Sequence, residues 1–326
     1  MATTLETTYA GLKLRNPIIV GSSGLSNSAE KNRGLYEAGA GAVVLKSLFE
    51  EQILMDADNL SNPYMASEGD DYLLSYVRMH RLEEYLTLIR DTKKVCPIPV
   101  IASISCYDNS NWVEFARQIE AAGADALEIN ILALQTAADY KAGSFEQRHI
   151  EILRHVKKNV SIPVIMKLGN NITNHIALME QLKANGAAAA VLFNRFYQPD
   201  IDIERMEHTA GSVFSHADEF SNTLRWVGIA SASVRRLDIA ASGGVHSAES
   251  LVKALLAGAS AVELCSVIYR KGDGVIEDYS RFLAKWMEGK GFASIKEFRG
   301  RLNAGTPEKV NTFERTQFLK YYSSKE

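Results

Sequence analysis

One short pattern recurs four times along this chain of 326 residues, and it limits the folds that the chain can adopt. Each copy has a glycine suited to ending a helix, then small residues, then an apolar run typical of a strand buried on both faces. The segment NWVEFARQIE before the second copy keeps its apolar residues on one helical face. The pattern therefore predicts repeated helix–strand units. The copies are EAGAGAVVLK, AAGADALEIN, KANGAAAAVLFN and LAGASAVELCS, which end at Lys46, Asn130, Asn194 and Ser266.

Four further segments have the character of buried strands. Three begin at a proline, which is tolerated at the first position of a strand because proline has no N–H to donate. Eight strands separated by helix-length segments predict an α/β protein, specifically a (β/α)8 TIM barrel. A doubly wound sheet is the alternative, but GSSGLS after the first strand does not match the GxGxxG fingerprint. The four segments are NPIIVG from Asn16, IPVIAS from Ile98, IPVIMK from Ile162 and LDIAASGG from Leu237.

The barrel pattern extends over the chain as a single expected domain, residues 1–326. Two intervals, 48–94 and 195–235, are longer than a crossover needs, and both follow the carboxyl ends of predicted strands. Since that end is the functional face of such barrels, we expect both intervals to be caps over a site. The tail, residues 279–326, alternates charged and aromatic residues and predicts helix packed on the outside of the barrel.

Composition excludes several classes of function. The net charge of −3 argues against a nucleic-acid partner, which would need a concentrated basic surface. No apolar run approaches the length of a membrane span, and the amino terminus lacks the order of a signal peptide. The cysteines, Cys96, Cys106 and Cys265, lack the spacing of a metal site. We therefore expect a soluble cytoplasmic protein with no metal site, no membrane partner and a small-molecule substrate.

Polar and small residues stand at the carboxyl ends of the predicted strands, where a barrel built for stability alone would have Val, Ile and Leu. Lysine and asparagine are costly there unless they meet a ligand or one another. The glycines of ASGGV and the serine of ELCS follow the last two strands, a usual place for a phosphate site made of backbone N–H groups. The strand-end residues are Gly21, Ser22, Lys46, Ser47, Ser103, Ser105, Asn130, Lys167, Asn194, Ser242, Gly243, Gly244, Cys265 and Ser266.

Each of these residues also has a structural interpretation. Lys167 can stabilise a group that becomes anionic, or it can form a salt bridge with a carboxylate such as Glu128. The same two roles are open to Lys46. Asn130 and Asn194 can recognise the edge of a planar heterocycle, or they can cap loose backbone groups. The glycine pair can be a simple turn, and Cys265 a small buried apolar residue.

The order of the strand ends resembles the dihydroorotate dehydrogenase family, most closely its soluble class 1 branch. The motifs that carry the resemblance are NPIIVGSS, VVLKSL, VIMKL, LFN, ASGGV and ELCS, and they span almost the whole chain. The resemblance implies an FMN-binding barrel that oxidises dihydroorotate to orotate, in pyrimidine biosynthesis, or acts on a related small planar substrate. It also implies a homodimer. The sequence does not identify the electron acceptor or a partner that would carry it.

The resemblance also implies residue roles. Lys46 and Lys167 would be the catalytic lysines, with Lys167 beside N1 and O2 of the flavin while hydride passes to N5. The expected substrate contacts are Lys46, Asn130, Gln135 and Asn194. The expected FMN contacts are Gly21, Ser22, Lys46, Ser47, Asn130, Lys167, Asn194, Ser242, Gly243, Gly244, Cys265 and Ser266.

The chain departs from the family where the catalytic base is expected. In the family the strand-end asparagine that corresponds to Asn130 begins the motif N-[LIV]-S-[CS]-P-[NH], whose Cys or Ser removes the proton from the substrate. Here the base position falls on Ala133 and the last position on Gln135. A methyl group cannot accept a proton, so the base is not identified. The stretch Met79-His80-Arg81 also departs from the family's pattern. Candidate replacement bases near the expected mouth are Cys106, Tyr140, Ser144, His208 and His216.

Three functions are consistent with these residues. The first is an FMN oxidoreductase of the dihydroorotate dehydrogenase type. The second is an auxiliary or diverged FMN barrel without the family's base, for which Ala133 is the reason. The third is a flavin-free lyase or aldolase that uses Lys167 or Lys46 as a Schiff-base nucleophile.

Overall fold

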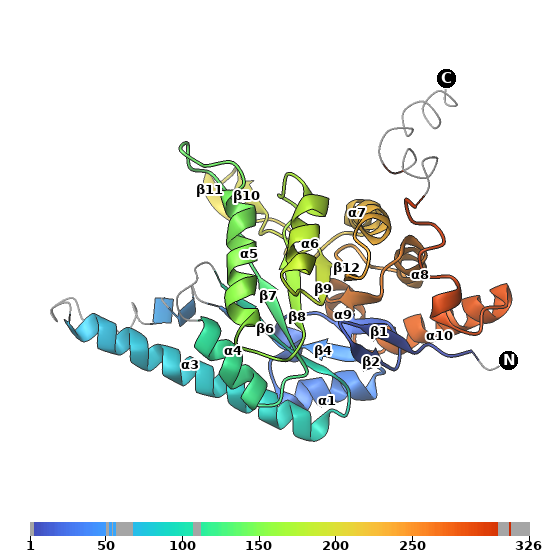
Figure 1. The fold of residues 1–326 in the computed structure, drawn as a ribbon, viewed down its shortest axis with the longest axis horizontal. Helices are drawn as coiled ribbons and strands as arrows, with labels where there is room; N and C mark the ends of the chain where they lie inside the picture. The colour runs from blue at the N-terminus through green and yellow to red at the C-terminus, as the bar shows by residue number, and fades with distance from the viewer. Residues whose placement is uncertain are drawn as a thin grey trace.

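A computed structural model describes residues 3–49, 52–53, 55–56, 68–106, 112–305 and 313. Within this part of the chain, parallel strands pair in sequence order and the last one pairs with the first, which closes the sheet. Helices surround the strands (Figure 1). The predicted (β/α)8 barrel is therefore confirmed. Its eight strands are β3 (Ile18–Val20), β4 (Ala42–Val44), β6 (Val100–Ser105), β7 (Ala126–Asn130), β8 (Val164–Leu168), β9 (Ala189–Leu192), β12 (Asp238–Ser242) and β13 (Ala261–Leu264).

Local sequence signals set the helix ends. The side chains of Ser28, Asn174 and Ser247 each accept a backbone N–H in the first turn of the helix that they precede. Gly258 ends its helix with a φ of 117°, a left-handed conformation that favours glycine. The helices are α1 (Ala29–Glu37), α3 (Glu68–Val95), α4 (Trp112–Ala121), α5 (Ser144–Lys157), α6 (His175–Ala184), α7 (Phe220–Ser233), α8 (Ala248–Ala257), α9 (Ser266–Lys271) and α10 (Val275–Lys290), with short 3₁₀ turns at η1 (Gly24–Ser26), η2 (Ala217–Glu219) and η3 (Ile295–Glu297).

The inside of the barrel is apolar at its amino-terminal end. A hairpin of β1 (Thr7–Tyr9) and β2 (Leu12–Leu14) packs its buried Tyr9 and Leu14 into the same cluster as the inward residues of the strands. We call this cluster the plug. Side chains along a strand point inward at every second position, so the next inward residues lie nearer to the carboxyl end of the barrel, above the plug. The strand residues of the cluster are Ile19, Ala42, Val44, Ile101, Ala126, Ile165, Ala189, Val191, Ala240 and Ala261.

The two long intervals contain different structures. In the first, β5 (Leu48–Phe49) extends the sheet beside β6, and α3 packs on α1 along one edge of the molecule (Figure 1). In the second, an exposed antiparallel hairpin of β10 (Pro199–Asp202) and β11 (Glu207–Ala210) precedes η2 and α7. Much of the first interval, including 57–67, lies outside the described residues, as does most of the tail beyond 305. The single-domain boundaries stay a prediction.

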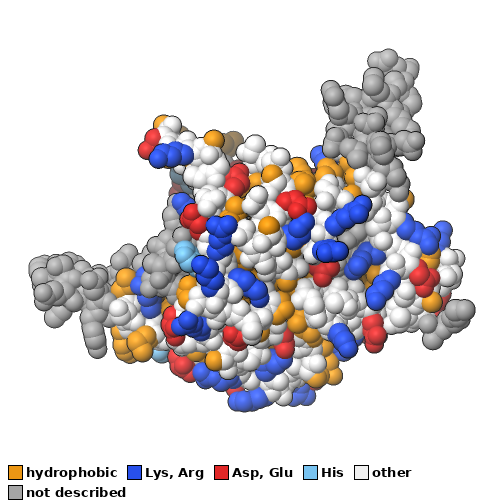
Figure 2. Space-filling view, viewed as in Figure 1, with side chains coloured by type: hydrophobic (Ala, Val, Ile, Leu, Met, Phe, Trp, Pro, Cys, Tyr) orange, Lys and Arg blue, Asp and Glu red, His pale blue; other side chains and the backbone are white. Residues whose placement is uncertain are grey.

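The surface of the described chain is mixed in charge. Figure 2 shows Lys and Arg side chains interspersed with Asp and Glu on the face in view, rather than gathered in one basic field. No helix in the described ranges combines the length and the apolar character needed to cross a bilayer.

Truncating the barrel plug tests its contribution to stability. Leu14 is 1% exposed, so Leu14→Ala removes packed methyl groups and leaves a cavity, which should lower the free energy of unfolding by about 2–5 kcal/mol. Leu302→Ala is the matched control, since Leu302 is 57% exposed and its truncation should change stability by less than about 0.5 kcal/mol. Urea denaturation measures both. Equal losses in the two variants would contradict the role of the plug.

Candidate active site

The strand ends converge on a cavity of about 720 Å³ at the carboxyl end of the barrel. A second cavity of about 170 Å³ shares Ser22, Lys167, Asn194 and Arg195 with it, so the two are adjacent. The second cavity is also lined by Gly21, Ser242, Gly243, Gly244, Cys265 and Ser266. The structure thus places Lys167 and the Gly243–Gly244 pair at one mouth, as the sequence predicts.

Lys167, on β8, has the most constrained environment at this mouth. Its Nζ lies 2.7 Å from Oε2 of Glu263 on β13 and 3.5 Å from Oε1 of Glu128 on β7. All three side chains are nearly inaccessible to solvent. The salt bridge to Glu128 that the sequence suggested is therefore present, and Lys167 lines the cavity as well. The closer partner, Glu263, was missed, although it stands two positions before Cys265 and so faces the same side of its strand.

The carboxylates control the charge of this lysine. Burial alone would lower the pKa of Lys167, but the charges of Glu128 and Glu263 oppose burial and the pKa is raised. Burial and the charge of Glu263 raise the pKa of Glu128 to about 8, against the opposing effect of Lys167. Lys167 is therefore a cation at neutral pH. A Schiff-base nucleophile has to be an uncharged amine, so this environment does not suit a lysine of that kind.

Two asparagines meet across the top of the barrel. Nδ2 of Asn194 donates to Oδ1 of Asn130 at 2.8 Å, and the backbone N–H of Arg195 donates to Oδ1 of Asn194 at 2.8 Å. The second contact fixes which way the Asn194 amide is turned, because its oxygen has to face an N–H donor. Both amides line the larger cavity and present oriented polar groups to it.

Serines join three neighbouring strand ends. Oγ of Ser47 lies 2.9 Å from Oγ of Ser22 and 2.8 Å from Oγ of Ser103, and the N–H of Ser47 donates to Ser22. Lys46 precedes this chain of hydroxyls, but its exposed side chain lines a separate cavity of about 260 Å³. Ser47 lines both cavities. The structure therefore brings Lys46 next to the main cavity, but not into its described wall.

The glycine loop after β12 passes close to α7. Gly243 and Gly244 have φ values of 100° and 73°, and a Cβ on Gly244 would lie 2.2 Å from the backbone nitrogen of Phe220. Oγ1 of Thr223 donates to the carbonyl oxygens of Ser242 and Gly243. Among the described residues, the N–H groups of the glycine pair have no hydrogen-bond acceptor. They are available to an anionic ligand.

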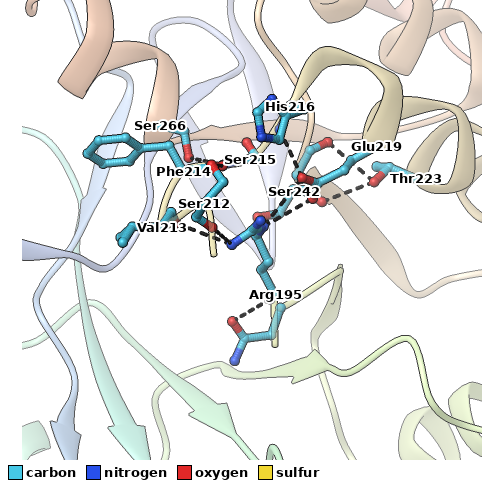
Figure 3. Close-up of polar contacts among 12 residues, drawn as sticks. Arg195, Ser212, Val213, Phe214, Ser215, His216, Glu219, Thr223, Ser242 and Ser266 are labelled. Atoms are coloured by element: carbon cyan, nitrogen blue, oxygen red, sulfur yellow. Dashed lines mark hydrogen bonds and ion pairs between the residues drawn. The ribbon is translucent and has the colours of Figure 1, made fainter. Parts of the chain in front are cut away.

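A strap, residues 211–216, crosses this end of the site and is held by contacts that the sequence did not predict. Arg195 points toward it (Figure 3), and its Nη1 donates to the carbonyl oxygens of Ser212 and Val213 at 2.9 and 3.2 Å. Nε of Arg195 donates to Glu219. The N–H of Ser215 donates to Oγ of Ser266 at 3.0 Å. The available signal for Arg195 was its position directly after a strand-end asparagine.

The structure brings none of the candidate replacement bases into the wall of the three cavities described above, as far as the described residues show. The backbone of Ala133 accepts a hydrogen bond from Asn171, and its neighbour Leu132 lines the main cavity. Gln135 is half-buried and also lies outside that wall. The candidates are Cys106, which is buried, Tyr140 in the loop before α5, Ser144 at the start of α5, His208 on the exposed hairpin, and His216, whose backbone N–H donates to Glu219. Among the described residues, the acidic residues in the wall of the largest of these three cavities are Glu128 and Asp56.

A methyl group at Gly244 tests the close approach of its loop to α7. Gly244→Ala should cost more stability than Gly291→Ala, because both residues have a φ of 73° but only Gly244 has neighbours within 4 Å of the added Cβ. The left-handed conformation should cost about 1–3 kcal/mol in each variant, and the clash in Gly244→Ala should add to it. Thermal unfolding of both variants makes the comparison. Equal melting temperatures would contradict the packing of the loop.

Comparison with known proteins agrees with this geometry. The family model described as dihydroorotate dehydrogenase matches residues 4–287. The catalytic subunit of dihydroorotate dehydrogenase B (NAD(+)) from Thermoplasma volcanium is 27% identical over 305 residues, covering 91% of this chain and 97% of the relative. The corresponding subunit from Methanosarcina mazei is 28% identical, with 90% and 93% covered. The NAD-dependent dihydropyrimidine dehydrogenase subunit PreA from Escherichia coli K12 is 26% identical, with 92% and 77% covered. This chain therefore belongs to the dihydroorotate dehydrogenase family, and it is an oxidoreductase of the type that acts on CH–CH groups.

Proposed function

We propose that this chain binds FMN across the two adjacent cavities and oxidises a CH–CH bond of dihydroorotate or a related cyclic amide. The observation that carries the proposal is the placement of a buried lysine and two oriented asparagines at one mouth with an unpaired glycine loop. Bound FMN would supply a hydride acceptor at N5. The chain's own residues hold the cofactor and orient the substrate.

The smaller cavity suits the phosphate group of FMN. Gly243 and Gly244 line it, and glycine allows the backbone to approach a phosphate closely. Gly21, Cys265 and Ser266 line the same cavity. In this proposal Ser266 both contacts the phosphate and accepts a hydrogen bond from the strap. Phosphate binding would therefore stabilise the position of the strap, and the strap would stabilise phosphate binding.

The larger cavity suits a planar ring and its substrate. Lys167, Asn130 and Asn194 line it, and they offer one cationic and two amide groups to a ring that has alternating donors and acceptors. Ser22 and Ser47 form an adjoining wall and would contact FMN as well. Lys46 would turn from its neighbouring cavity to contact the ligand, and Gln135 would contact the substrate. Dihydroorotate and dihydropyrimidine appear in the names of the relatives, and both are cyclic amides of this kind.

An auxiliary role is the second candidate function. Ala133 has a methyl group where the family's base is expected, and the relatives are subunits of NAD-dependent enzymes. In this candidate the barrel passes electrons to or from a partner chain, and it oxidises dihydroorotate slowly. We propose a homodimer as the core of either assembly and the cytoplasm as its location.

The phosphate assignment predicts a specific loss of FMN affinity. Ser266→Ala removes one hydroxyl from the proposed phosphate end and the acceptor of the Ser215 N–H, so FMN affinity should fall about tenfold. Ser221→Ala, an exposed serine at the start of α7, is the control and should leave affinity unchanged. Quenching of flavin fluorescence measures both constants. Wild-type protein that does not bind FMN would overturn the proposal.

The family's base position predicts a gain of function. In anaerobic stopped-flow experiments, Ala133→Cys should speed flavin reduction by dihydroorotate about 10²–10⁴-fold, since a thiol can accept the proton that a methyl cannot. Ala137→Cys, in the same loop, is the matched control and should have no effect. Rapid reduction of the wild-type protein, with no gain in Ala133→Cys, would show that another group is the base. Dihydrouracil, tested in parallel, distinguishes the two substrate classes.

A further inference from the structure

A buried cluster of three charged side chains lies at the floor of the larger cavity. We call Glu128, Lys167 and Glu263 the triad. The three side chains come from β7, β8 and β13, so they meet across the inside of the barrel rather than along one strand. Glu128 and Glu263 are 1% and 3% exposed, which leaves almost no contact with solvent. The triad has one ammonium group and two carboxyl groups.

The charges of the triad do not balance if both carboxyl groups are ionised. The net charge would then be −1 among side chains that are almost closed to solvent, which is costly for a folded protein. Among the described residues, the ion pairs of Glu128 and Glu263 are both made with Lys167. One added proton makes the triad neutral.

Hydrogen bonding in the triad indicates that the two carboxyl groups hold that proton. Oε2 of Glu263 accepts a hydrogen bond of 2.7 Å from the Lys167 ammonium. Oε1 of Glu128 lies 3.5 Å from the ammonium, which is longer than a usual charge-assisted hydrogen bond. Among the described residues, both oxygens of Glu128 and Oε1 of Glu263 are buried without a hydrogen-bond partner. Both carboxyl groups lie beside the same ammonium group, at 2.7 and 3.5 Å, so a proton on either one removes the excess negative charge.

We propose that Glu128 and Glu263 hold one proton between them beside the Lys167 ammonium, so that the triad is neutral and stores a proton beneath the ligand cavity. The two glutamates are positioning residues, because they act on the ligand through Lys167. Lys167 then presents to the ligand a positive charge that the remaining carboxylate of the triad already balances. Burial and the neighbouring carboxylate keep the Glu128 pKa raised to about 8, in agreement with a proton held at neutral pH.

Tyr9 and Cys265 interact with the triad, and neither of them supplies a positive charge. Tyr9 approaches from β1, and burial together with the charges of Glu263, Glu128 and Asp238 raises its pKa, so it stays neutral. Burial raises the pKa of the Cys265 thiol, which Lys167 and Ser23 partly offset. Asp238 on β12 is held by the N–H of Ala10 and the hydroxyl of Ser260.

Infrared spectroscopy of the full chain labelled with ¹³C-carboxyl glutamate tests the shared proton without any ligand. Wild-type protein at pH 7 should show the carbonyl band of one protonated glutamate, and the band should disappear with a midpoint near pH 8. Glu263→Gln and Glu128→Gln should each lose the band at pH 7, because one carboxylate then balances Lys167. Glu277→Gln, an exposed carboxyl on α10, is the control and should retain it. Absence of the band in wild type, or its survival in either triad variant, would overturn the proposal.

Stability gives a second readout if one variant folds poorly. The Glu128 pKa is raised from 4.5 to about 8 in the folded chain, so the stabilising effect of its proton is complete below pH 4.5 and is lost as the pH rises through 8. In urea denaturation, wild type should therefore lose stability relative to Glu128→Gln as the pH rises over this range, and the difference should stay constant above it. A difference independent of pH would contradict the proposal.

The consequence for the ligand rests on the proposed function, whereas the shared proton does not. If the ring of bound FMN becomes anionic on reduction, its negative charge near Lys167 should make the triad hold its proton more tightly. The infrared midpoint should then move to higher pH. A midpoint that ignores bound, reduced FMN would contradict this consequence. Failure of FMN to bind would contradict the proposed function instead, and the ligand-free titration would still stand.

Discussion

The contact between the Lys167 ammonium and the Glu263 carboxylate, 2.7 Å long and closed to solvent, is the interaction on which the rest of the site depends. A lysine without a partner at that depth would lose its proton or disturb the fold. With its partners it remains charged and fixed at the boundary between the apolar plug and the cavity. The contact also joins β8 to β13 across the barrel, so the position of the charge is set by the closed sheet.

Residues that stabilise the barrel by packing lie at its amino-terminal end, and residues that line the ligand cavity lie at its carboxyl end. Tyr9, Leu14 and the small inward residues fill the amino-terminal end, and this packing leaves polar inward positions only toward the carboxyl end. There, strands far apart in the sequence deliver their last residues to one mouth. The strap and Arg195 then cover the end where the glycine loop lies (Figure 3).

Much of this arrangement could be predicted from the sequence because it repeats. The recurring glycine and apolar run identified four strands, and buried-strand segments, most of them with a proline near the start, identified the other four. The last residues of both groups marked the mouth, including Lys167, Asn130, Asn194 and the glycine pair. Glu263 and Arg195 could not be found in this way. The pairing of Glu263 with Lys167 depends on the register between strands that are separated by 96 positions in the chain. Lys46 was predicted to line the main cavity, but it is not in the described wall of that cavity. Its position at a strand end does not determine which way its long, exposed side chain turns.

Family membership narrows the chemistry, and the local environment refines the role of each group. Lys167 has two buried carboxyl partners, Glu128 and Glu263, so its effect on a ligand includes their protonation. The most direct measurement of the account is a crystal structure of the chain with FMN bound. The account predicts the phosphate at the N–H groups of Gly243 and Gly244 and the polar edge of the ring beside Lys167. FMN bound elsewhere, or with its phosphate against Lys167, would contradict it.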